Sequence, residues 1–185
     1  MRRALIVIDV QGDMLAMRDA GYAWANPKAQ TTIAAVLAAF RAKGLPVVHV
    51  HHHELEPGAA MAPGSPGAAA LPCALPTEDE PVFIKTGSSA FIGTGLEDHL
   101  RAENLTDLVI IGGEANMCVE SSTRMAANLG FSAVVVEDAL INFQRSLRDG
   151  TVMPAETVLA MTLANLNGGF ARIVTCDEVV QELTP

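Results

Sequence analysis

Six short apolar runs, separated by segments with helical periodicity, constrain the fold of this chain more than any other feature. The runs cover residues 4–9, 45–51, 81–85, 108–113, 132–138 and 171–175. Most of these residues are β-branched or aliphatic, and they show little polar alternation, which is typical of strands that are buried on both faces. The pattern therefore predicts an α/β fold: a three-layer αβα domain with a six-stranded, mostly parallel sheet of Rossmann-like topology.

The segments between the runs predict helices and one long loop. A helix is predicted to open at Asn26, a cap residue that precedes Pro27, and to end at Gly44. Another helix is predicted over residues 117–129, after the fourth strand. Residues 54–80 are rich in Pro, Gly and Ala without periodicity, so we expect a long loop there, close to the functional site.

Composition limits the class of protein. The chain has 185 residues and is 50% apolar, which suits one domain over residues 1–185 with a substantial core. A net charge of −9 disfavours nucleic acid as a partner. No apolar stretch is long enough to span a membrane, the N-terminal run is too short for a secretory signal, and the three cysteines do not suggest a disulfide framework. We therefore expect a cytoplasmic protein with a small-molecule substrate.

Chemically useful side chains stand at the carboxyl ends of the predicted strands, where parallel sheets bind ligands. Asp9 ends the first strand, Lys85 ends the third, and Cys118 follows the fourth at a predicted helix start. A helix start lowers the pKa of a thiol, a carboxylate can take the thiol proton, and an ammonium can hold the developing charge. A lone cysteine is more often a small buried residue, but this context favours a nucleophile. Asp138 also ends a strand, and we interpret it as a capping residue.

Three segments, in order, resemble the isochorismatase-like cysteine hydrolases, a family that includes nicotinamidases and N-carbamoylsarcosine amidase. They are IDVQGDM at 8–14, FIKTGSSAFIGTGLEDHL at 83–100 and IIGGEANMCVESSTRMAANLGFSAVVVEDA at 110–139. The resemblance covers nearly the whole chain. It implies an isochorismatase-like fold with a catalytic triad of Asp9, Lys85 and Cys118.

The resemblance also implies a mechanism and an assembly. A cis peptide bond between Gly113 and Glu114 would direct the backbone N–H groups of Glu114 and Cys118 at an oxyanion. The implied reaction is cleavage of a C–N bond in a small amide, ureide or carbamoyl compound through a thioester, with no cofactor. In that reaction Asp9 takes the thiol proton, Cys118 attacks the carbonyl and Lys85 keeps both poised. Members of the family usually form dimers, so a homodimer or larger homo-oligomer is expected.

The sequence departs from the family at two positions near these motifs. The family has Thr or Ser three residues before the cysteine, where this chain has Ala115, so Glu114 or Asn116 would have to fix the turn. Met14 stands where the family has Phe. Neither departure affects the triad.

Four histidines cluster at the end of the second predicted strand. On an extended segment His49, His51 and His53 share one face, and His52 points the other way. One interpretation is a weak metal site, since imidazole is a common ligand for zinc or iron-type ions. Nicotinamidases carry an Asp-x-His and a further downstream His, and this chain lacks that pattern. We therefore favour histidines that line a pocket or an interface, and nicotinamidase activity becomes a less favoured assignment.

Five residues near strand ends or in loops are candidates for a substrate pocket. They are Gln11, Trp24, Phe91, Met117 and Phe143. For Trp24 and Phe143, a position in the core or an interface is an equal alternative. Cys73 and Cys176 have no acid and lysine in matching positions, and we expect both to be inert.

Other functions fit the sequence less well. A haloacid-dehalogenase-type phosphatase also has Asp after its first strand, but its D-x-D motif needs an acid where this chain has Gln11. A dinucleotide-binding protein needs a G-x-G-x-x-G turn after the first strand, and this chain has none there. A true isochorismatase is disfavoured because its vinyl-ether hydrolysis uses no cysteine nucleophile. A catalytically idle member of the fold, which binds a ligand or a partner, is the alternative from another class.

Overall fold

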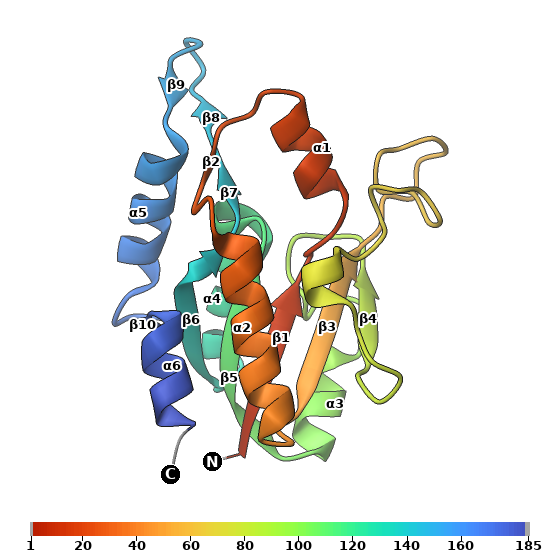
Figure 1. The fold of residues 1–185 in the computed structure, drawn as a ribbon, viewed down its shortest axis with the longest axis vertical. Helices are drawn as coiled ribbons and strands as arrows, with labels where there is room; N and C mark the ends of the chain where they lie inside the picture. The colour runs from red at the N-terminus through yellow and green to blue at the C-terminus, as the bar shows by residue number, and fades with distance from the viewer. Residues whose placement is uncertain (1, 184–185) are drawn as a thin grey trace.

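In the computed structural model, which describes residues 2–183, one six-stranded sheet lies between two layers of helices (Figure 1). In spatial order its strands are β10 (Arg172–Val174), β6 (Ser132–Leu140), β5 (Leu105–Gly112), β1 (Arg2–Ile8), β3 (Val47–His52) and β4 (Val82–Lys85). Each neighbouring pair is parallel. The predicted three-layer α/β fold is confirmed, and this sheet is wholly parallel.

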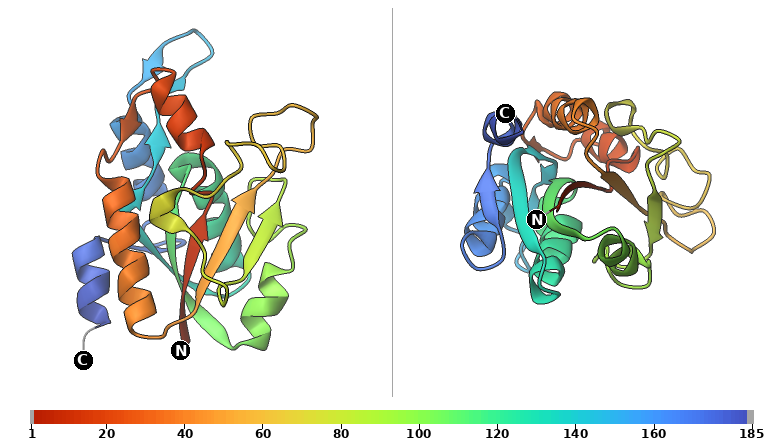
Figure 2. Two further views of the ribbon diagram at one scale, coloured as in Figure 1. Left: turned by 45° about the vertical axis from the view of Figure 1, so that its right-hand side comes forward. Right: turned by 90° about the horizontal axis from the view of Figure 1, so that it is seen from below.

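Helices cover both faces of the sheet, and each face has its own apolar core (Figure 2). One face carries α2 (Ala29–Ala42) and α6 (Cys176–Glu182); the other carries α3 (Leu96–Ala102), α4 (Glu120–Asn128) and α5 (Ala155–Leu166). Successive residues of β1 enter the two cores in turn, which explains why its sequence shows no polar alternation. Within the described residues, no helix has the length and apolarity needed to cross a bilayer.

Several short elements were not predicted. They are α1 (Asp13–Asp19), the 3₁₀ turn η1 (Pro72–Ala74), helix α6, and the antiparallel pairs β2 (Trp24–Ala25) with β7 (Asn142–Phe143) and β8 (Arg145–Ser146) with β9 (Val152–Met153). The paired strands have two residues each, and α1 has seven. Elements this short contain less than two full periods of an apolar pattern, so periodicity does not reveal them.

The start of α2 differs from the prediction. The helix begins at Ala29, and Asn26 does not cap it. Asn26 adopts a left-handed backbone conformation with φ of 55°. Its side-chain amide donates to the backbone carbonyls of Glu137 and Leu140 at 2.8 and 3.0 Å. Asn26 therefore ties the loop before α2 to β6.

Two glycines allow loops to approach the carboxyl end of β1. Gly112 has φ of 125°, and a Cβ atom there would lie 2.0 Å from the carbonyl oxygen of Ile8. A Cβ atom on Gly12 would lie 2.1 Å from the carbonyl oxygen of Pro66. The first contact brings the turn after β5 against β1, and the second brings the loop of residues 54–80 to the same place. Any other residue at either position would force these loops apart.

Candidate active site

Asp9, Lys85 and Cys118 meet at the carboxyl edge of the sheet. Asp9 follows β1, Lys85 is the last residue of β4, and Cys118 lies in η2 (Ala115–Val119), a π-helical segment between β5 and α4. The Lys85 Nζ atom lies 2.7 Å from Asp9 Oδ2 and 3.2 Å from Cys118 Sγ. Asp9 and Lys85 are 2% and 1% exposed, and Cys118 is partly buried. The three residues singled out from the sequence thus form one contact group around a buried ammonium.

The two carboxylate oxygens of Asp9 have different surroundings. Oδ2 forms the ion pair with Lys85, whereas Oδ1 is buried and has no hydrogen-bond partner among residues 2–183. Burial raises the pKa of Asp9, and the Lys85 ammonium opposes that rise. A buried carboxylate oxygen without a donor is unfavourable. Oδ1 is therefore the atom of this site that is free to accept a proton.

The thiol of Cys118 is held in its neutral form. Burial raises the pKa of Cys118 to about 12; the Asp9 carboxylate adds to the rise and the Lys85 ammonium opposes it. The expectation of a lowered thiol pKa at a helix start is thus wrong. Cys118 lies within η2 beside a carboxylate, and loss of hydration is the largest cause of its raised pKa.

The turn before Cys118 is fixed by polar contacts from the segment after β6. The peptide bond between Gly113 and Glu114 is cis. The Glu114 carboxylate pairs with Arg145, whose guanidinium also donates to Asn116 Oδ1 at 3.3 Å. The Asn116 N–H donates to the buried Asn142 side chain at 3.1 Å. Both residues that were expected to replace the missing family hydroxyl therefore hold the turn. The Glu114 N–H has no hydrogen-bond partner in the described chain.

His52 is a member of this contact group, and the sequence placed it only among histidines expected to line a pocket or an interface. β3 and β4 pair in parallel with His52 directly opposite Lys85, and directly opposed side chains lie on the same face of a sheet. The His52 Nδ1 atom lies 3.3 Å from Lys85 Nζ. Alternation along the strand correctly separated His52 from its neighbours. Together with the register between β3 and β4, this separation would have predicted the contact between His52 and Lys85.

The other histidines of residues 49–53 make different contacts. His49 is fully buried, and its Nε2 lies 2.9 Å from Glu80 Oε2. His51 packs edge-on against His49, with ring centroids 6.2 Å apart, and burial lowers the pKa of His51 to about 4. The His53 backbone N–H donates to the Lys85 carbonyl at 2.9 Å. In residues 2–183, no group of three or more His, Cys, Asp or Glu side chains is arranged to hold a metal ion.

Two of the pocket candidates lie near the triad. Met117 precedes Cys118 in η2 and is 48% exposed, so it is placed to contact a ligand. Gln11 is fully buried and has a structural role. Its side-chain amide donates to the carbonyls of His52 and Ala68 at 3.0 and 2.8 Å, and its Oε1 accepts the His52 N–H at 2.7 Å. Gln11 thus joins the ends of β1 and β3 to the long loop.

Of the three aromatic pocket candidates, Phe143 lies in an apolar core, and Trp24 and Phe91 are partly buried against the cores. Trp24 and Phe143 face each other across the β2–β7 pair, with ring centroids 6.0 Å apart, and Phe143 is fully buried. Phe91 stacks on Phe131 at 5.8 Å, and Phe131 precedes β6 at the amino edge of the sheet. Only 4% of the residues are aromatic, and these three are used to fill space between elements rather than to line a pocket.

The other predicted roles fall outside the site. The Asp138 Oδ1 atom accepts the Cys176 N–H at 2.8 Å at the start of α6, which confirms the capping interpretation. Asp138 lies within β6, because that strand is longer than predicted. Burial raises the pKa of the Cys73 and Cys176 thiols, and neither has a lysine partner.

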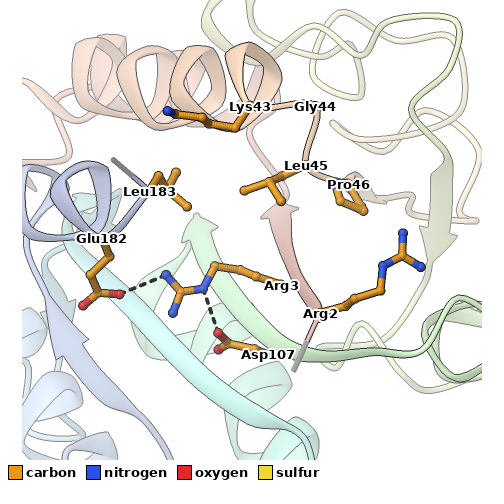
Figure 3. A pocket seen from close by; sticks show the side chains of 9 residues that line it. All are labelled: Arg2, Arg3, Lys43, Gly44, Leu45, Pro46, Asp107, Glu182 and Leu183. Carbon is orange, nitrogen blue, oxygen red and sulfur yellow. Dashed lines mark hydrogen bonds and ion pairs between the residues drawn. The ribbon is translucent and has the colours of Figure 1, made fainter. Parts of the chain in front are cut away.

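A surface cavity of about 740 Å³ lies at the opposite, amino edge of the sheet (Figure 3). It is lined by Arg2, Arg3, Lys43, Gly44, Leu45, Pro46, Asp107, Glu182 and Leu183. The Arg3 guanidinium lies 2.7 Å from Asp107 Oδ2 and 2.9 Å from Glu182 Oε2. Arg3 is thus paired with two carboxylates, and none of the triad residues lines this cavity.

Comparison with known proteins identifies the family of this chain. The model of the isochorismatase domain family matches residues 3–164. The isochorismatase family protein YrdC of Bacillus subtilis (strain 168) is 34% identical over 182 residues, which cover 98% of this chain and 96% of YrdC. A crystal structure from Chromobacterium violaceum ATCC 12472, assigned to the isochorismatase family, is 38% identical with a TM-score of 0.93 and covers 98% and 93% of the two chains. The ureidoacrylate amidohydrolase RutB of Agrobacterium fabrum (strain C58 / ATCC 33970) is 44% identical over 55 residues, 30% of this chain and 24% of RutB. The chain therefore belongs to the isochorismatase family and is a hydrolase of that family.

Proposed function

We propose that this protein is a cysteine hydrolase that cleaves a C–N bond of a small amide, ureide or carbamoyl compound through a thioester. One observation carries the proposal: the buried Lys85 ammonium lies within hydrogen-bonding distance of both the Asp9 carboxylate and the Cys118 thiol. A nucleophile, a base and a fixed positive charge thus share one site. The chain supplies each of these groups itself, so the proposed reaction uses no cofactor.

The first step moves the thiol proton from Cys118 to Asp9. Before transfer, the site holds an ammonium, a carboxylate and a neutral thiol; afterwards it holds an ammonium, a neutral carboxyl and a thiolate. The net charge of the buried group is zero in both arrangements, so the transfer does not leave an unpaired buried charge. The raised pKa of Asp9 favours acceptance of the proton, and loss of the Asp9 charge removes one cause of the raised pKa of Cys118.

The thiolate then attacks the carbonyl carbon and forms a C–S bond, and the carbonyl electron pair moves onto oxygen. The Glu114 N–H, which has no partner among the described residues, is available to that oxyanion. Cys118 is the fourth residue of η2, and the first N–H groups of a helix lack intrahelical partners. We assign the Glu114 and Cys118 N–H groups as the oxyanion donors. The contacts of Arg145 and Asn142 keep this turn in place.

Collapse of the tetrahedral intermediate breaks the C–N bond. The proton held by Asp9 passes to the leaving nitrogen, which departs as ammonia or an amine. Water then attacks the thioester carbon while Asp9 accepts a proton from it. The C–S bond breaks, and Asp9 returns this proton to the Cys118 thiolate as the acid is released. Asp9 therefore acts twice as a base and twice as an acid within one turnover.

The surroundings of the site favour a small substrate without a large negative charge. The chain carries a net charge of −9, so polyanions are disfavoured. The reacting groups are buried by the loops after β1 and β5, which limits the size of the acyl group. RutB, a partial match, is named for a ureide substrate, and this supports amides and ureides as the first compounds to test.

A screen for ammonia release over small amides, ureides and carbamoyl compounds tests the proposal. We expect the wild-type protein to release ammonia from at least one class of compound and Cys118→Ala to release none. Hydrolysis that persists in Cys118→Ala would refute the mechanism. If the wild-type protein released ammonia from none of these classes but bound one of them, the idle, ligand-binding alternative would be favoured instead.

A further inference from the structure

We propose that His52 is a fourth functional residue of this site: a neutral imidazole that accepts a hydrogen bond from Lys85 at Nδ1 and donates one from Nε2 to an oxygen of the substrate. The proposal rests on the proposed hydrolase function and extends it to substrate binding. His52 is neither a member of the predicted triad nor one of the histidines considered for a metal site.

The contact with Lys85 determines the tautomer of His52. The two atoms are 3.3 Å apart, and an ammonium has donors only. The His52 Nδ1 atom must therefore act as the acceptor, which leaves the single proton of a neutral imidazole on Nε2. A doubly protonated ring would place a second cation against Lys85 with no acceptor between them.

The Lys85 ammonium has more acceptors than protons. Its acceptors are Asp9 Oδ2 at 2.7 Å, the Gly87 carbonyl at 3.1 Å, Cys118 Sγ at 3.2 Å and His52 Nδ1 at 3.3 Å. Three N–H groups cannot serve these four atoms at once. The two longest contacts therefore compete for one N–H, and the thiolate that forms during reaction is the stronger acceptor. The two acceptors share this N–H in the resting state, and the sulfur takes it from His52 as the sulfur becomes charged.

The backbone of His52 is fixed from two directions. β3 and β4 set His52 opposite Lys85, and both backbone polar groups of His52 are bonded to the buried Gln11 amide. A side chain on paired strands with such support is held more precisely than one on a free loop. Gln11 thus acts on the site through His52.

The far nitrogen of the ring is unpaired within the described residues. His52 is partly buried, and its Nε2 has no hydrogen-bond partner within residues 2–183, yet Nε2 is not among the fully buried atoms that lack partners. A fixed, unpaired N–H donor on a residue that shares the Lys85 ammonium with the nucleophile favours a hydrogen-bond acceptor on the substrate. We therefore infer that the substrate carries a second oxygen, as a ureide carbonyl, amide or carboxylate, and not a cationic group, near its scissile carbonyl.

Two substitutions at His52 separate its role from general packing. His52→Leu removes both the acceptor and the donor, whereas His52→Asn retains an amide oxygen and an N–H group. With the substrate found in the ammonia-release screen, we expect His52→Leu to lower kcat/KM by about 10- to 100-fold, the range for loss of a hydrogen bond to a charged partner. We expect His52→Asn to recover most of this loss. His99→Leu, which replaces a histidine on α3, is the matched control and should leave kcat/KM unchanged.

Nitrogen-15 NMR of the histidine rings in the full-length wild-type protein tests the tautomer without any turnover. At neutral pH we expect His52 to show a protonated Nε2 and an unprotonated Nδ1. A ring protonated at Nδ1, or at both nitrogens, would overturn the inference even if the protein proves to be a hydrolase. The expected tautomer with no activity on any amide would leave the Lys85 contact standing and refute the hydrolase function. Equal kcat/KM in wild-type and His52→Leu would overturn the role in substrate binding.

Discussion

The two edges of the sheet both gather charged side chains, but they treat these charges differently. At the amino edge, Arg3 is paired with both Asp107 and Glu182, and its side chain is 21% exposed (Figure 3). At the carboxyl edge, Lys85 and Asp9 are almost fully buried, and one oxygen of Asp9 has no partner within the described chain. Charged side chains that are paired and hydrated have little tendency to change their protonation state. Buried charged side chains with too few or too many hydrogen-bond partners exchange protons more readily.

The cause of this difference is the arrangement of loops. At the carboxyl edge, Gly112 and Gly12 allow the turn after β5 and the long loop to cover the end of β1. At the amino edge, the cavity beside Arg3 is open to solvent. The same types of side chain therefore form a buried contact group at one edge and partly exposed ion pairs at the other.

The largest effect is expected on the free energy of unfolding, when the positive charge at one edge or the other is removed in separate variants. Lys85→Met leaves the buried Asp9 carboxylate unpaired, which costs about 3–5 kcal/mol of unfolding free energy, and it should also abolish turnover. Arg3→Met removes partly exposed ion pairs and should cost about 1 kcal/mol or less. Urea denaturation of both variants measures the contrast. Equal losses of stability would break the distinction between the two edges.

A second prediction concerns the charge of Asp9: its removal should raise the rate of Cys118 alkylation and lower the rate of amide hydrolysis. In Asp9→Asn the carboxylate that raises the pKa of Cys118 is gone, so the thiol pKa should fall from about 12. At one fixed alkaline pH, alkylation of Cys118 by iodoacetamide should therefore become faster, while amide hydrolysis is lost with the base. Asp107→Asn at the amino edge is the control, and it should change neither rate. Slower alkylation in Asp9→Asn would mean that the carboxylate does not oppose thiolate formation.

A smaller effect is expected on the pH dependence of stability. The pKa of Cys118 is raised from 9.0 to about 12 in the folded protein, so the folded state retains a proton that the unfolded chain releases. The resulting stabilisation is fully present below pH 9.0 and is lost as the pH rises through about 12. Over this alkaline range, Cys118→Ala should lose less stability than the wild-type protein does. Parallel stability curves would show that the buried thiol is not held protonated.

The smallest effects are expected at the other two cysteines. Cys73 and Cys176 lie outside the group around Lys85, and the contact at the start of α6 is made by the backbone of Cys176. Cys73→Ser and Cys176→Ser should leave kcat/KM unchanged with the substrate found in the screen. A marked loss of turnover in either variant would extend the active site beyond the carboxyl edge of the sheet.

These comparisons also show what the sequence could predict. The apolar runs predicted the strands. The grouping of the residues that follow them could be predicted because the carboxyl ends of parallel strands share one edge of the sheet. The role of His52 was not readable, since it depends on the register that sets it opposite Lys85. The raised pKa of Cys118 was also hidden, because desolvation arises from loops brought together only in the folded chain. Gln11 was a pocket candidate by position. Its buried amide instead joins the backbones of His52 and Ala68, segments that meet only in the folded chain. The homodimer or larger oligomer stays a prediction.

The central claim is that Cys118 forms a covalent thioester with the acyl part of an amide substrate. Rapid acid quenching during turnover, followed by mass spectrometry of the digested protein, tests this most directly. We predict a mass increase equal to the acyl group on the peptide that contains Cys118, absent in Cys118→Ala. Turnover with no such adduct on Cys118, or with the adduct on Cys73 or Cys176, would contradict the account.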